Sequence, residues 1–236
     1  MPLDPQVQGL LTEMAALGNP PIHSLSVEDA RAASEGMVML AGEKAEVGSV
    51  RDIRIPVEDG DIGARVYTPA GAGPHPAVVF FHGGGWVICS LDTHDNLARD
   101  ICRAADAVVV SVDYRMAPEH RYPTAVHDSF AATRWVADNS ASLDVDATRL
   151  ALCGDSAGGN LSAVVSQMAR DSGGPAIAFT ALIYPGVDMT AKGGSMDENG
   201  TGYFLETDDM EWFMNHYLDE VDKAEAKASP LLHGDL

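Results

Sequence analysis

The alternation between short apolar runs and longer stretches of helical periodicity constrains the fold of this chain more than any other feature. The apolar runs cover residues 77–81, 107–112, 150–153 and 178–184, and stretches of helical periodicity separate them at residues 92–104, 124–137 and 157–170. A strand that is apolar on both faces is buried on both faces, and helices then cover the sheet. The chain is therefore predicted to form an α/β fold with a mostly parallel sheet.

The segments before and after this alternating region add further elements. Residues 50–57 and 62–67 alternate apolar and polar side chains around a turn, which predicts a β-hairpin. Two helices are expected before the hairpin, both packed on the core, and Ser26 with Asp29 fits a capping box at the start of the second. Thr207 is expected to be the N-cap of a last helix. A chain of 236 residues fits one domain of this kind.

The pentapeptide G-D-S-A-G at residues 154–158 follows one apolar run directly and leads into a helical stretch. A serine in a G-x-S-x-G motif between a strand and a helix is typical of a nucleophile elbow. Such a turn would hold the Ser156 hydroxyl in the open beside a helix N-terminus, where negative charge is stabilised. Ser156 is therefore the candidate nucleophile.

A second motif, H-G-G-G-W at residues 82–86, follows the apolar run 77–81. Its three glycines allow backbone N–H groups to approach a substrate and to stabilise a developing oxyanion. A phosphate-binding loop is the alternative, and it is disfavoured because neither a G-x-G-x-x-G pattern nor a Walker lysine accompanies the glycines. His82 ends a buried strand, which favours a structural hydrogen-bonding role over that of a general base.

With these two motifs in this order, the chain resembles the hormone-sensitive-lipase-like family of α/β-hydrolases, which includes bacterial carboxylesterases and lipases. The resemblance extends to D-Y-R-M-A-P-E at residues 113–119, Y-P at 122–123, Y-P-G-V-D at 184–188 and S-P-L-L at 229–232. It implies an α/β-hydrolase fold, with helices on both faces of a mostly parallel sheet and a helical cap. It also implies that Ser156 is the nucleophile and that an oxyanion hole is formed by N–H groups of Gly84, Gly85 and Ala157, with Gly83 supporting the turn.

The same resemblance divides the chain into four segments. Residues 1–48 are expected to form the N-terminal helical part of the cap, 49–187 the hydrolase core, 188–222 the second part of the cap, and 223–236 an incomplete return to the core. Five aromatic residues are the candidates for an acyl or alcohol pocket, with packing between cap and core as the alternative: Trp86, Tyr203, Phe204, Trp212 and Phe213.

The sequence departs from the family after its last motif. A serine nucleophile needs a base, and the base needs an orienting acid, in the chain order serine, acid, histidine. The D-P-L-x-D-like and H-G-F-like segments that carry the acid and the histidine in the family are missing from these residues. Three hypotheses follow: a shortened form of an esterase, with its last strands missing; an in-chain triad of Ser156, Asp188 and either His216 or His233; or a non-catalytic α/β-hydrolase-like binding protein or a chain completed by another subunit.

The function expected from the resemblance is that of a serine carboxylesterase. It would hydrolyse short- to medium-chain carboxylic esters through an acyl-enzyme, with weak or no activity in this form. No cofactor and no metal site are expected, because scattered single histidines do not form a ligand cluster.

Charge and cysteine content restrict the partners. The net charge is −20, from 35 acidic against 15 basic residues, which excludes nucleic acid and an anionic membrane surface. The apolar runs are too short to span a bilayer, and no signal peptide is recognised, so a cytoplasmic location is expected. The three cysteines suggest neither a disulfide framework nor a zinc site. If the strand 178–184 lies at the edge of the sheet, it is expected to favour self-association.

Overall fold

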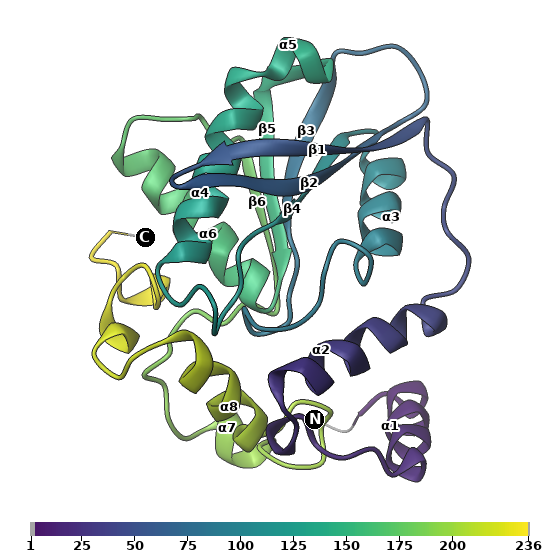
Figure 1. Ribbon diagram of the computed structural model, residues 1–236, viewed down its shortest axis with the longest axis vertical. Helices are drawn as coiled ribbons and strands as arrows, with labels where there is room; N and C mark the ends of the chain where they lie inside the picture. The colour runs from purple at the N-terminus through teal and green to yellow at the C-terminus, as the bar shows by residue number, and fades with distance from the viewer. Residues whose placement is uncertain (1–2, 236) are drawn as a thin grey trace.

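The computed structural model describes residues 3–235 and contains a six-stranded sheet in the order β1-β2-β4-β3-β5-β6. Residues 1–2 and 236, at the ends of the first and last predicted segments, lie outside the described part. The strands are β1 Ser49–Val57, β2 Gly60–Thr68, β3 His75–Phe81, β4 Val108–Asp113, β5 Val145–Asp155 and β6 Phe179–Ile183. β3, β4, β5 and β6 run parallel, and β1 and β2 are antiparallel additions (Figure 1). The predicted mostly parallel sheet is confirmed.

The hairpin forms where the alternating residues predicted it. β1 and β2 pair from Ser49↔Thr68 to Val57↔Gly60, so the turn is tighter than the sequence suggested. Asp59 in this turn adopts a positive φ of 63°, a conformation that aspartate tolerates better than most residues. β2 then pairs antiparallel with β4, which joins the hairpin to the parallel part of the sheet.

Helices cover both faces of the sheet because successive strand residues point to opposite sides. On one face, alternate residues such as Val79 and Leu152 pack beneath α4 (Thr124–Asp138) and α6 (Ala157–Asp171). On the other face, Phe80 and Cys153 pack with α3 (Asp95–Ala105). The short helix α5 (Ser140–Leu143) precedes β5. The strands at the centre of the sheet are therefore apolar on both faces, as the continuous apolar runs predicted.

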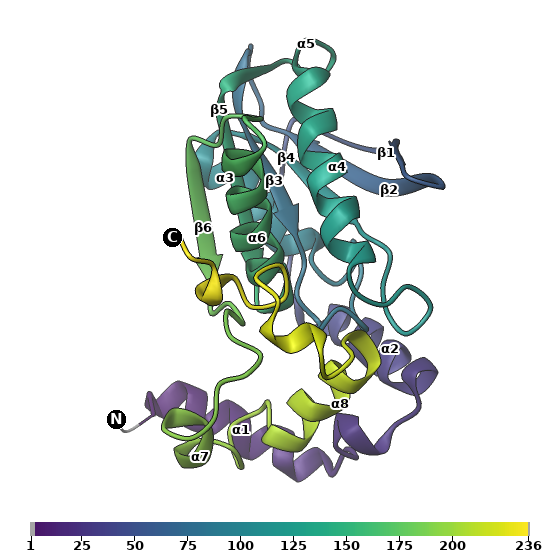
Figure 2. The same ribbon diagram turned by 90° about the vertical axis from the view of Figure 1, so that its left-hand side faces the viewer.

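The remaining helices gather at the end of the sheet towards which β6 points (Figures 1 and 2). They are α1 (Pro5–Leu17), α2 (Val27–Gly36), α7 (Ser195–Glu198) and α8 (Thr207–Tyr217), with 3-10 turns at Ile22–Ser24 and Met37–Leu40. The His23 ring and its backbone N–H both contact the buried Asp209 carboxylate, at 2.8 and 3.1 Å. The first part of the chain is thereby joined to α8, 186 residues later.

Two expectations for these helices were wrong. α1 has no buried residue, and Leu10 and Leu17 are 56% and 69% exposed, so this helix is not part of the core. The N-cap of α8 is Glu206 rather than Thr207, because the Glu206 and Asp209 side chains form a capping box with each other's backbone N–H. Ser26 is the N-cap of the second helix as predicted, since its Oγ accepts a hydrogen bond from the Asp29 N–H. The Asp29 carboxylate accepts from the Ser26 hydroxyl, so the bonds described form only one half of the predicted capping box.

After α8 the chain returns to the core through the 3-10 turns Asp222–Ala224 and Pro230–Leu232. Asn160 on α6 donates from its side-chain amide to the carbonyl oxygens of Gly186 and Ala228. The buried Ser229 hydroxyl accepts from the Met189 N–H at 2.7 Å. These contacts attach the segment after α8 to the region that follows β6. In the described part of the chain, no helix combines the length and apolarity needed to cross a bilayer.

The packing of β5 leads to a prediction about stability. Leu152 is fully buried, whereas Leu231 is 51% exposed. Replacement of Leu152 by alanine should lower the free energy of unfolding by about 2–5 kcal/mol, because it removes buried methyl groups and leaves a cavity. The matched change Leu231→Ala should cost less than about 1 kcal/mol. Urea unfolding followed by circular dichroism measures both, and equal losses would contradict the described packing.

Candidate active site

Ser156 lies in a strained turn between β5 and α6. Its φ is 53° and its ψ is −116°, a combination that a residue with a Cβ atom adopts only at an energetic cost. The turn is held by the Ser156 N–H, which donates to the Ile183 carbonyl of β6 at 2.9 Å. The residue is partly exposed, while Gly154 and Ala157 are buried. The serine of the G-D-S-A-G motif is therefore presented at the N-terminus of α6.

The glycine motif lies beside this turn because β3 and β5 are parallel neighbours. Phe81, which precedes the glycine motif, and Gly154, the first residue of the serine motif, face each other in the strand register. The Gly83 N–H donates to Asp155 Oδ1 at 2.9 Å, which links the two motifs directly. A Cβ atom at Gly83 would collide with the Asp155 carboxylate, so this close approach requires glycine.

The backbone N–H groups predicted to form an oxyanion hole are free of hydrogen bonds to other groups in the described part of the chain. Among the described residues, the N–H groups of Gly84, Gly85 and Ala157 donate to no protein acceptor. Ala157 is the first residue of α6, where the N–H groups have no partner within the helix and the helix dipole is positive. N–H groups that are free at such positions can donate hydrogen bonds to a substrate oxygen and stabilise the negative charge that develops on it.

His82 has the structural role that the sequence predicted. Its ring is fully buried, stacks on Tyr114 at 4.5 Å, and hydrogen-bonds through Nδ1 to the Gly83 carbonyl at 2.7 Å. The Tyr114 hydroxyl donates to the His82 carbonyl at 2.8 Å. Burial, reinforced by repulsion from His94, lowers the pKa of His82 to about 4. The ring is therefore neutral at pH 7 and supports the start of the glycine loop.

The five aromatic candidates for a pocket do not form one group. Trp86 and Phe213 are 5% and 7% exposed and belong to the core, and the Trp86 ring stacks on that of Tyr217 at 4.4 Å. Tyr203 and Phe204 are 41% and 64% exposed.

α8 nevertheless touches the candidate site. A Cβ atom at Gly85 would collide with the Phe213 ring, so this helix packs directly on the glycine loop. Trp212 is half-buried and meets Phe213 edge-on at 5.1 Å. Packing between the helix and the core thus accounts for Trp86 and Phe213.

The structure does not assemble the in-chain triad. The Asp188 carboxylate accepts hydrogen bonds from the N–H and hydroxyl of Thr190, at 2.8 and 2.6 Å. His233 pairs with Asp171 at 3.1 Å, and Asp171 ends the 15-residue helix that Ser156 precedes, roughly 20 Å away along the helix axis.

His216, the other histidine considered for the triad, packs edge-on against Trp212 at 4.4 Å. Within residues 3–235, no hydrogen bond joins a histidine to the Ser156 hydroxyl.

Two residues near the site were not singled out from the sequence. Asp155 had no role there beyond its place in the G-D-S-A-G motif, and His94 had none. Asp155 is buried and lies 3.3 Å from His94 Nε2. Burial alone would raise the pKa of Asp155, but His94 and the Gly83 N–H outweigh it, and the pKa lies below its usual value. Asp155 stands inside the serine motif, where the adjacent glycine loop could have suggested a role. His94 carries no comparable sequence signal. No group of three or more potential metal ligands occurs in the part of the chain described.

Comparison with known proteins agrees with this geometry. The pattern of the alpha/beta hydrolase fold family matches residues 78–236. The chain is 44% identical to the carboxylic ester hydrolase LipN of Mycobacterium tuberculosis over 98% of this chain and 63% of that protein. It is 35% identical to an arylesterase of Saccharolobus solfataricus, over 100% of this chain and 78% of that protein.

Solved structures give the same result. An esterase from the archaeon Pyrobaculum calidifontis superposes with a TM-score of 0.92 at 40% identity, over 98% of this chain and 75% of that one. An alpha/beta hydrolase enzyme from the metagenome of Lake Arreo gives a TM-score of 0.94 at 38% identity, over 99% and 76%. The chain belongs to the α/β-hydrolase fold family, in its branch of bacterial carboxylesterases. It spans between half and two thirds of the length of LipN and of the carboxylesterase NlhH from the same organism.

The burial of His82 predicts a pH dependence of stability. Its pKa is about 4 in the folded chain and 6.5 in the unfolded one, so the unfolded chain binds a proton more readily between these values. Stability should therefore fall as pH decreases from about 6.5 towards 4, by about 2 kcal/mol from this residue between pH 7.5 and 5. The variant His82→Asn cannot titrate there and should lose less stability over this range. Urea unfolding at both pH values measures the difference, and identical losses would refute the assignment.

Proposed function

We propose that this chain is a carboxylic ester hydrolase that acts through an acyl-enzyme on Ser156. The observation that carries the proposal is the strained Ser156 turn beside a glycine loop whose backbone donors are unoccupied. The printed functions of the relatives, a carboxylic ester hydrolase and an arylesterase among them, support the same class of reaction.

The roles in this reaction follow from the positions of the groups. Ser156 Oγ attacks the ester carbonyl carbon, its proton passes to a water molecule, and the carbonyl oxygen becomes an oxyanion. The N–H groups of Gly84, Gly85 and Ala157 stabilise this oxyanion, while Gly83 anchors the loop to Asp155. The intermediate collapses, and an acyl group remains on Ser156. The same proton is returned through water to the alkoxide, which then leaves as the alcohol. Water then attacks the acyl carbon, which releases the acid and restores the hydroxyl.

The substrates we propose are short- to medium-chain carboxylic esters. α8 borders the glycine loop through Phe213, and the segment at its N-terminal side carries the exposed Tyr203 and Phe204. We propose that residues 1–48 and 188–222 act together as a cap over the serine. The contact between His23 and Asp209, which joins these two segments, supports that division.

We expect slow turnover from residues 1–236 alone. No histidine among the described residues is hydrogen-bonded to Ser156, and loss of triad partners costs several orders of magnitude in rate. Oxyanion stabilisation leaves a residual acceleration over water.

Hydrolysis of p-nitrophenyl acetate tests the proposal. This ester suits the test because its leaving group departs as a phenolate and needs no general acid. The wild-type chain should release p-nitrophenol faster than the buffer does. Ser156→Ala should lower this rate, because it removes the attacking hydroxyl and leaves only the acceleration from the oxyanion donors. The matched variant Ser166→Ala, on the same helix, should retain the wild-type rate. Equal rates for the wild type and Ser156→Ala would refute a serine mechanism and favour a non-catalytic binding protein.

The free edge of the sheet leads us to propose self-association as well. β6 pairs only with β5 among the described strands, and Phe179 and Leu182 on it are 67% and 42% exposed. An edge strand that has one unpaired side and exposed apolar side chains can pair with a second copy of the chain.

Light scattering over a range of protein concentrations measures this association. The apparent mass should rise with concentration for the wild type and less for Phe179→Lys/Leu182→Lys, because charge on an edge strand opposes pairing. The control Leu231→Lys should behave as the wild type. A monomer at all concentrations would contradict the proposal.

A further inference from the structure

The Asp155 side chain holds the glycine loop, and His94, which lies just before α3, in turn contacts Asp155. Asp155 is 8% exposed, and its carboxylate accepts from the Gly83 N–H at 2.9 Å. His94 Nε2 approaches the same oxygen, at 3.3 Å from Oδ1, and lies 3.5 Å from Oδ2. Because a carboxylate accepts hydrogen bonds and donates none, Nε2 must carry the proton in this contact. His94 thus stabilises the charged form of Asp155 at the place where Asp155 binds the loop.

His94 is oriented by its own neighbour. Its Nδ1 lies 2.8 Å from the Thr93 hydroxyl, whose proton can be donated either to Nδ1 or to the Ser90 carbonyl at 2.9 Å. The Thr93 oxygen also accepts from the Ser90 N–H at 2.9 Å. The side chain of His94 is 13% exposed, so the ring is enclosed as well as hydrogen-bonded at both nitrogens. A ring restrained in this way can restrain its partner.

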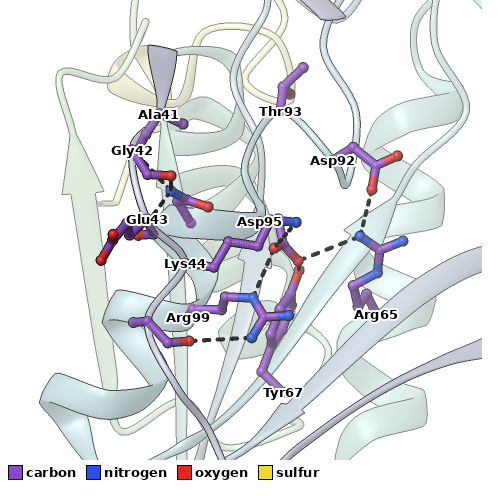
Figure 3. A network of polar contacts seen from close by, with 12 residues as sticks. Ala41, Gly42, Glu43, Lys44, Arg65, Tyr67, Asp92, Thr93, Asp95 and Arg99 are labelled. Carbon is purple, nitrogen blue, oxygen red and sulfur yellow. Dashed lines mark hydrogen bonds and ion pairs between the residues drawn. The ribbon is translucent and has the colours of Figure 1, made fainter. Parts of the chain in front are cut away.

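The position of His94 depends on the start of α3, which a buried carboxylate fixes. Asp95, the first residue of α3, is 2% exposed. It accepts hydrogen bonds from the Tyr67 hydroxyl and from Arg99 Nε, each at 2.8 Å, and pairs with Lys44 Nζ at 2.8 Å (Figure 3). Although burial opposes ionisation, these donors lower the pKa of Asp95 to about 2. The N-terminus of α3 is thereby tied to β2 and to the segment before β1.

From this geometry we propose that His94 is a positioning residue for the oxyanion loop, acting through Asp155. It holds the Asp155 carboxylate in the orientation that receives the Gly83 N–H, and this bond places the free N–H groups of Gly84 and Gly85. The expected effect on the reaction rate rests on the proposed function. The effect of His94 on the position of the loop rests only on the contacts of His94 and Gly83 with Asp155.

The direct test is amide hydrogen exchange at Gly83, measured by NMR on the full chain. His94→Ala should accelerate exchange of the Gly83 N–H by about tenfold or more, because Asp155 loses its second partner. His94→Gln, whose amide can still donate to the carboxylate, should restore most of the protection. Asn96→Ala is the matched control, since Asn96 lies at the same end of α3 but bonds to the carbonyls of Ala41 and Gly42 instead. It should leave the exchange of Gly83 unchanged.

A double-mutant cycle tests whether His94 acts through Asp155. Asp155→Ala alone should also expose the Gly83 N–H, and adding His94→Ala should change the exchange no further. Additive effects would overturn the proposal, because they would mean that His94 supports the loop by another route. Unchanged exchange in His94→Ala, or equal exchange in His94→Ala and Asn96→Ala, would overturn it as well.

The kinetic consequence is measured separately with p-nitrophenyl acetate. A displaced oxyanion donor affects the transition state more than substrate binding, so His94→Ala should lower kcat about tenfold and leave KM within about twofold. His94→Gln should recover most of kcat. A rise in KM at constant kcat would contradict the positioning role. If the wild-type chain shows no Ser156-dependent hydrolysis, the proposed function fails, while the exchange measurements still decide the role of His94.

Discussion

The parallel pairing of β3 with β5 is the constraint on which the candidate site depends. Parallel strands end at the same edge of a sheet, so the residues that follow Phe81 and Gly154 must emerge side by side. The glycine loop and the Ser156 turn are therefore neighbours, although more than seventy residues separate them. The bond from Gly83 to Asp155 then joins the two motifs at their first turns.

Two buried carboxylates near this edge are paired with hydrogen-bond donors. Asp155 contacts Gly83 and His94, and Asp95 contacts four donor side chains at the start of α3. A carboxylate remains charged in such surroundings only when donors compensate for lost hydration, which is why both have lowered pKa values. His82 shows the opposite outcome, because it is enclosed without a compensating anion in contact and stays neutral.

The helices beyond the sheet contribute to the site through packing. Phe213 of α8 lies against Gly85, and Tyr217 of the same helix stacks on Trp86. The glycine loop is thus held by β3, which leads into it, and by the bond from Gly83 to Asp155. It is also held by the packing of α8 against Gly85. A change in the position of α8 would act directly on the backbone donors of the loop.

The sequence alone determined the sheet, the helices between its strands and the two motifs, because these depend on local periodicity and on glycine and serine at fixed spacing. It also indicated that His82 is structural, since a histidine at the end of a buried strand has little access to solvent. Only the tertiary structure showed the surroundings of His94, Trp86 and α1. His94 belongs to no motif and meets Asp155 through the packing of α3, and Trp86 is buried with its ring stacked on that of Tyr217. The apolar spacing of α1 predicted a buried face, but burial depends on a partner surface, and in the described structure this helix has only partly buried residues, Leu11 and Met14.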